Sequence, residues 1–118
     1  MFNPKLCAAL EEKGIKCYLP QRDTHQEGEK DMVWKQNTDA ISLLPVTLAV
    51  AENESPNWGV EVGFAYAQKK HLVALAQTDH DVPLMARLMF KEIVRADDLN
   101  DISAYIDELA HALQEGSV

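Results

Sequence analysis

Short apolar segments alternate with stretches of helical periodicity along this chain, and this alternation constrains the fold more than any other feature. The clearest apolar segment is residues 46–51 (VTLAVA), which lies between Pro45 and a polar turn. An apolar run of this length between turn residues is typical of a buried strand. Strands that alternate with helices form βα units, so we predict a three-layer α/β fold with a mostly parallel sheet and helices on both faces.

The alternation predicts a four-stranded sheet in a single domain of residues 1–118. The predicted strands are residues 15–19, 46–51, 72–76 and 92–95, and the predicted helices are residues 3–14, 30–44, 58–70, 83–90 and 98–114. Ligands of such sheets bind beyond the carboxyl ends of the strands. We therefore expect function in the loops at residues 21–29, 52–57 and 77–81.

The charge balance bears on the partners of the chain. The formal net charge is −8, which repels phosphate backbones and anionic lipid. No apolar run approaches the roughly 20 residues that span a bilayer. We therefore expect no nucleic-acid or membrane partner, although local backbone donors could still hold a small nucleotide.

Cysteine and histidine usage gives no sign of a disulfide framework or a metal centre. Cys7 and Cys17 have no metal-ligand spacing, and neither His71 nor His80 has a partner at such spacing. No secretory signal is visible at the N-terminus, and two cysteines suit a reducing compartment. We predict a cytoplasmic protein without a metal site.

The most informative segment runs from the strand at residues 46–51 into the following helix. Ser55-Pro56 is a plausible N-cap and first helical position, and Glu61 follows within the first turns. Gly59 and Gly63 together cost the helix about 2 kcal/mol relative to alanine. We expect a close backbone contact to compensate for that cost.

This segment resembles the strand–turn–helix signature of the nucleoside 2-deoxyribosyltransferase family. Residues 61–67 (EVGFAYA) and 70–73 (KHLV) match its glutamate motif and the strand that follows, and residues 14–23 (GIKCYLPQRD) are similar to its second strand and base-facing loop. The resemblance implies a flavodoxin- or Rossmann-like fold. The family begins with one further strand, and this sequence starts at the helix after it.

The resemblance also implies an activity: cleavage or transfer at the N-glycosidic bond of a (deoxy)nucleoside or its 5′-monophosphate. Glu61 matches the glutamate that attacks the anomeric carbon, and Gln21 and Asp23 match base-side contacts. A carboxylate suits this chemistry because positive charge develops on the sugar as the base leaves. The family implies no cofactor and assembles as homodimers or larger homo-oligomers.

Two departures from the family pattern concern the substrate pocket. Ser55 stands where transferases of the family carry aspartate, and matches the serine with which the branch that hydrolyses nucleoside 5′-monophosphates contacts phosphate. Asn37 stands where the family frequently has aspartate. Asp39 is nearby, but it points about 200° away from Asn37 around the helix and is therefore no simple replacement for that aspartate. We expect Asn57, which replaces a frequent glycine, and Gly59 beside it to contact substrate.

Simpler interpretations stay open for these residues. Glu61 could be a solvent-facing or capping carboxylate, Ser55 only an N-cap, and Asn37 and Asp39 ordinary helix-surface residues. The alternative function is a non-catalytic nucleotide-binding or interaction module on the same scaffold. Three further side chains recur at helical spacing, which is typical of core or subunit contact: Met85, Leu88 and Met89.

Overall fold

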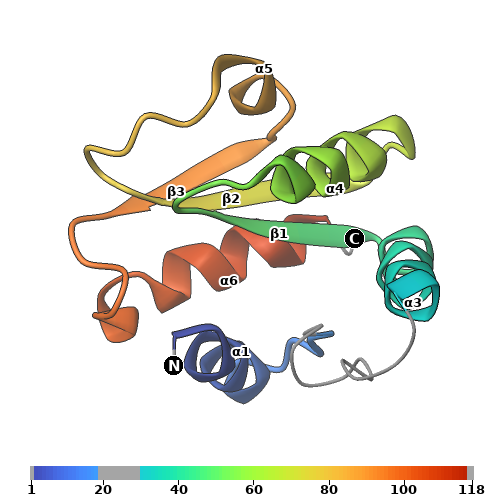
Figure 1. The fold of residues 1–118 in the computed structure, drawn as a ribbon. Coiled ribbons are helices and arrows are strands. Elements are labelled where there is room, and N and C mark those ends of the chain that lie inside the picture. The colour runs from blue at the N-terminus through green and yellow to red at the C-terminus, as the bar shows by residue number, and fades with distance from the viewer. Residues whose placement is uncertain (1, 19–29, 117–118) are drawn as a thin grey trace.

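The computed structural model describes residues 2–18 and 30–116 and shows the predicted alternation of helices and strands (Figure 1). The elements are α1 (Phe2–Glu12), α3 (Lys30–Leu43), β1 (Val46–Ala51), α4 (Pro56–Ala67), β2 (His71–Gln77), α5 (Leu84–Arg87), β3 (Glu92–Ala96), a 3-10 turn (Ile102–Ala104) and α6 (Ile106–Glu115). None of the described helices combines the length and the hydropathy needed to cross a bilayer.

The three strands form one parallel sheet in the order β1-β2-β3. Val46 of β1 pairs with His71, and Ala51 at its other end pairs with Ala76. Val73 of β2 pairs with Glu92 of β3. All three carboxyl ends therefore meet at one edge of the sheet, as predicted for a βα fold.

Helices cover both faces of the sheet, which confirms the predicted α/β class (Figure 1). Helices α4 and α5 lie over one face, and α6 lies on the other with α1 beneath it. Helix α3 contacts α4. The layered arrangement places the turn between β1 and α4 at the carboxyl edge of the sheet.

The prediction of a fourth strand at residues 15–19 is wrong for its described part. Residues 15–18 have no regular structure, and β1 pairs with no second strand among the described residues. Ile15 and Cys17 nevertheless pack against the main core. The apolar pattern therefore reflects burial, and a strand also needs a neighbour whose backbone it can pair with.

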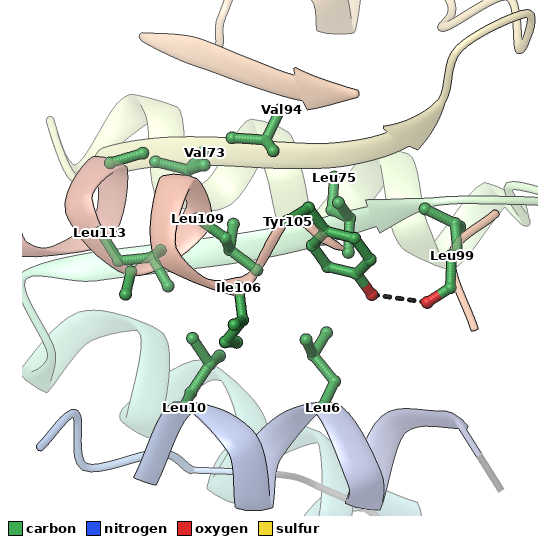
Figure 2. Packing of buried hydrophobic residues seen from close by; sticks show 12 residues of the cluster. Leu6, Leu10, Val73, Leu75, Val94, Leu99, Tyr105, Ile106, Leu109 and Leu113 are labelled. Carbon is green, nitrogen blue, oxygen red and sulfur yellow. Dashed lines mark hydrogen bonds between the residues drawn. The ribbon is translucent and has the colours of Figure 1, made fainter. Parts of the chain in front are cut away.

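The larger core lies between the sheet and the helices α1 and α6 (Figure 2). Alternate residues of the strands face it, including Val73, Leu75 and Val94, which are fully buried. Leu6 and Leu10 of α1 close it from below. The Tyr105 hydroxyl donates a 2.6 Å hydrogen bond to the Leu99 carbonyl within this core.

The opposite face of the sheet is lined by small side chains. Ala49 packs with Val62 of α4, and Ala51 and Ala76 form a second small cluster against Trp58. Methyl groups on the strands let the helix backbone approach the sheet closely. The start of helix α4, which carries Glu61, is therefore seated on alanines, whereas the fully buried Leu72 lies on the same face nearer the amino ends of the strands.

Candidate active site

The turn between β1 and α4 is shaped by its backbone and by a helix cap. Asn53 has a φ of 50°, in the left-handed region that asparagine tolerates in tight turns. Ser55 is the N-cap of α4, and its hydroxyl accepts a 3.3 Å hydrogen bond from the Trp58 backbone N–H. Pro56 follows as the first helical residue. The N-cap prediction for Ser55 is confirmed.

Trp58 fixes the start of α4 to the strand below it. Its indole N–H donates a 3.1 Å hydrogen bond to the carbonyl of Val50, near the end of β1. Because His71 N–H bonds to the Pro45 carbonyl, strand alternation directs the Val50 carbonyl away from β2. The indole thus satisfies a backbone acceptor on the outer edge of the sheet.

Glu61 lies in the second turn of α4 and is half-buried. It is three residues after Trp58 and four before the fully buried Ala65, so it belongs to the side of α4 that faces the sheet. Val62 packs toward Ala86 of α5, and Glu61 is rotated 100° from Val62. Glu61 therefore lies a little more than a quarter turn around α4 from the side that packs on α5.

Burial raises the pKa of the Glu61 carboxyl above its ordinary value. The helix N-terminus offsets this little, because the influence of a helix dipole fades beyond the first turn. The ionised form of Glu61 is consequently less stable here than it would be in water.

A second carboxylate at the same edge has a partner that the sequence did not indicate. Glu54, in the turn after β1, accepts a hydrogen bond from the His80 ring with Oε1 and Nε2 2.5 Å apart. Burial alone would raise the pKa of Glu54. The hydrogen bond from His80, a backbone hydrogen bond and the charge of the imidazole together lower it below its usual value.

The loop that carries His80 is held by β3. Arg95 donates from Nη1 to the carbonyls of Gln77 and His80, at 3.0 and 2.7 Å. The Thr78 hydroxyl donates to Asp97 over 2.7 Å. These bonds join the ends of β2 and β3. The backbone of His80 is therefore held in position by hydrogen bonds to β3.

The structure places four predicted residues, Ser55, Asn57, Gly59 and Glu61, on one helix and its N-cap. Ser55, Asn57 and Gly59 are exposed at the start of α4, six, four and two residues before Glu61. On the adjacent α3, two further residues differ in burial: Asn37 is half-buried and Asp39 is exposed. The predicted base-side contacts, Gln21 and Asp23, lie outside the described residues.

Two cavities formed by described residues lie away from Glu61. One of about 430 Å³ is at the amino ends of the strands, where Lys70, His71 and Lys91 line it. The other, of about 330 Å³, lies between the end of β3 and Tyr105. No three metal-ligating side chains are grouped in the part of the chain that the structure describes.

Together these features define an α/β domain with a parallel sheet and a half-buried carboxylate on the helix after its edge strand. No protein-family model matches the sequence, and no curated protein matches it. Among solved structures, the fold is similar to that of the CMP N-glycosidase BcmB from Clostridium botulinum. The TM-score is 0.71 at 19% sequence identity, over 90% of this chain and 86% of that one. The similarity shows a shared fold.

Proposed function

We propose that the chain cleaves the N-glycosidic bond of a nucleoside 5′-monophosphate, with Glu61 as the nucleophile. The observation that carries this proposal is a half-buried glutamate on α4 in a fold shared with a CMP N-glycosidase. The match of residues 61–67 to the deoxyribosyltransferase motif supports the same assignment. A deoxynucleoside is the second substrate class that this motif favours.

The proposed reaction begins when a Glu61 oxygen attacks the anomeric carbon. The C–N bond breaks, its electron pair leaves with the base, and a glycosyl–enzyme ester forms. Water then displaces the carboxylate to give the free sugar phosphate, or a second base takes the sugar. Because the attacking group must be ionised, the raised pKa of Glu61 limits the reaction at low pH.

The start of α4 suits a phosphate group. Ser55 is exposed there, and although its oxygen accepts from Trp58 N–H, its own O–H can still donate to a ligand. Pro56 has no N–H and the Trp58 N–H bonds to Ser55, so the backbone N–H of Asn57 is the first-turn donor that could bind an anion. In this proposal Asn57 and Gly59 contact the sugar, Asn37 and Asp39 line the pocket, and Gln21 and Asp23 contact the base.

The decisive experiment is release of free base from nucleoside monophosphates and deoxynucleosides, measured by chromatography. We expect Glu61→Gln to reduce the rate by about 10³-fold or more, since an amide cannot act as the nucleophile. Glu92→Gln is the matched control, because Glu92 is also half-buried but begins β3. Undiminished base release by Glu61→Gln would refute the assignment of Glu61 as the nucleophile.

The second candidate is a nucleotide-binding or interaction module without catalysis. It is favoured by the positions of the two cavities, neither of which is bordered by Glu61. Calorimetric titration with the same nucleotides separates the two functions. Binding of a monophosphate without base release, in the intact chain, would support the module and contradict the hydrolase.

A further inference from the structure

A cavity lined by lysines lies at the amino ends of the strands, on the edge of the sheet opposite to the turn that begins α4. Its volume of about 430 Å³ falls within the roughly 300 to 1,000 Å³ typical of small-molecule sites. The residues that line it include Lys69, Lys70, His71, Lys91 and Gly116. The cavity is thus separate from the proposed active site, and we call it the amino-edge cavity.

The charge of this cavity is opposite to that of the chain as a whole. Lys69, Lys70 and Lys91 line it, whereas no acidic side chain from the described residues does. In the part of the chain that the structure describes, none of these three lysines forms an ion pair. The net charge of the chain is −8, so three unpaired lysines in one cavity form a local positive field. Such a field attracts an anionic ligand.

The helix ends around the cavity account for only part of this charge. Helices α3, α4 and α6 end beside it, and the C-terminus of a helix carries about −0.5 of an elementary charge, which amounts to about −1.5 for three ends. Lys70 donates from Nζ to the Ser42 carbonyl in the last turn of α3 over 2.6 Å. An ammonium group has two further N–H donors after that bond. The three lysines therefore leave positive charge that the fold itself does not use.

Lys69 occupies a backbone position where glycine is the usual residue. Its φ is 60°, in the left-handed region, and it follows Gln68, the C-cap of α4. Glycine is favoured there because a Cβ atom crowds the backbone in this conformation. Residues in such unfavourable conformations cluster at ligand sites. A lysine at position 69 therefore indicates a function for its side chain beyond the ending of the helix.

The wall of the cavity between β2 and α6 is held in place without a ligand. His71 Nε2 lies 3.0 Å from the Ala112 carbonyl oxygen, and the imidazole is the donor because a carbonyl can only accept. Gly116 makes room for the ring, since a Cβ atom at that position would lie 2.4 Å from the imidazole. A wall that is already ordered lowers the entropic cost of binding.

We propose that the amino-edge cavity binds the phosphate chain of a small molecule, with Lys69, Lys70 and Lys91 as the charged contacts. Two or more linked phosphates carry several charged oxygens and can accept hydrogen bonds from three ammonium groups at once. Inorganic polyphosphate and the phosphate chain of a nucleotide share this chemistry. The site lies across the sheet from the start of α4 and does not depend on the proposed activity.

Calorimetric titration of the full chain with inorganic triphosphate tests the proposal. We expect the wild type to bind with a Kd of about 0.1 mM or tighter. Lys69→Gly and Lys91→Gln should each raise the Kd by about 10-fold, through loss of a hydrogen bond to a charged group. Lys69→Gly should keep the fold because glycine suits that backbone, and Lys91 is exposed.

The same titration with a nucleoside triphosphate distinguishes the two sources of phosphate. Tighter binding than that of inorganic triphosphate, with the same dependence on Lys69 and Lys91, supports the site and assigns it to a nucleotide. Equal affinity for the two ligands supports the site and assigns it to the phosphate chain alone.

Lys5→Gln is the matched control, because it removes the same charge from an exposed lysine of α1 that does not line the cavity. It should leave the Kd unchanged. A wild type that does not bind triphosphate, binding undiminished in both Lys69→Gly and Lys91→Gln, or equal weakening by Lys5→Gln would each overturn the proposal.

Discussion

His80 Nε2 lies 2.5 Å from Glu54 Oε1, and this contact joins the turn after β1 to the loop after β2. The two residues are 26 positions apart in sequence and meet because their strands are adjacent and parallel. Both side chains are largely buried, with exposures of 28% for His80 and 14% for Glu54.

Glu54→Gln should lower stability at neutral pH by about 1.5 kcal/mol, the typical value of a hydrogen bond to a charged group. Because the pKa of Glu54 is lowered on folding, its carboxylate stabilises the fold above the ordinary value of 4.5. That contribution disappears as pH falls through the lowered pKa. Thermal melting across this pH range tests it, with the exposed Glu52→Gln as control. A deficit that persists in strong acid would contradict it.

Glu61→Gln should raise the melting temperature at neutral pH while it reduces base release by about 10³-fold or more. The pKa of Glu61 is raised on folding, so wild-type stability falls as pH rises from 4.5 through that raised pKa. The glutamine variant has no charge to bury and should not show this fall. Melting curves of both proteins at acid and neutral pH measure the difference. Equal melting temperatures at neutral pH would argue against the burial of the charge.

Gly59→Ala and Gly63→Ala should each stabilise the single chain by up to about 1 kcal/mol. A methyl group at either position meets open space and restricts the unfolded chain. Gly14→Ala is the contrasting control, because Gly14 has a φ of +85°. A Cβ atom is unfavourable in that left-handed conformation, so this variant should be less stable than the wild type by about 1 kcal/mol. Urea titration at high dilution reports the values. Loss of stability at positions 59 or 63 would show that the glycines are needed within the chain.

Tyr105→Phe should cost about 1 to 2 kcal/mol, because the Leu99 carbonyl loses its partner inside the core. Burial, together with the charges of Asp98 and Asp101, raises the pKa of Tyr105 to about 12. Wild-type stability should therefore fall between pH 10 and about 12, where the unfolded chain ionises and the folded one does not. Chemical denaturation at alkaline pH should show a smaller fall in the phenylalanine variant.

The sequence predicted the sheet well where strands pair with neighbours inside the chain. Residues 46–51 form β1 with the predicted bounds, and β2 and β3 extend the predicted strands by one or two residues. Residues 15–18 share the apolar pattern but form no strand, because the pattern reports burial and not backbone pairing.

The candidate site was predictable only where its geometry is local. Ser55 and Pro56 indicate the start of α4 within four residues of sequence, and the structure confirms the cap. The Glu54–His80 contact depends on the pairing of β1 with β2, which periodicity does not specify. Its one signal was position, since both residues lie in loops that follow neighbouring strands.

The alanines beneath α4 determine how the proposed nucleophile can be altered. Ala49, Ala51 and Ala76 have no side-chain torsion that could move a larger group aside, so enlarging any of them would shift the helix as a whole. The height of residue 61 above the sheet is thus set by positions that no ligand reaches. A larger side chain in this buried layer would therefore shift the proposed nucleophile together with its helix, without any change at the surface around residue 61.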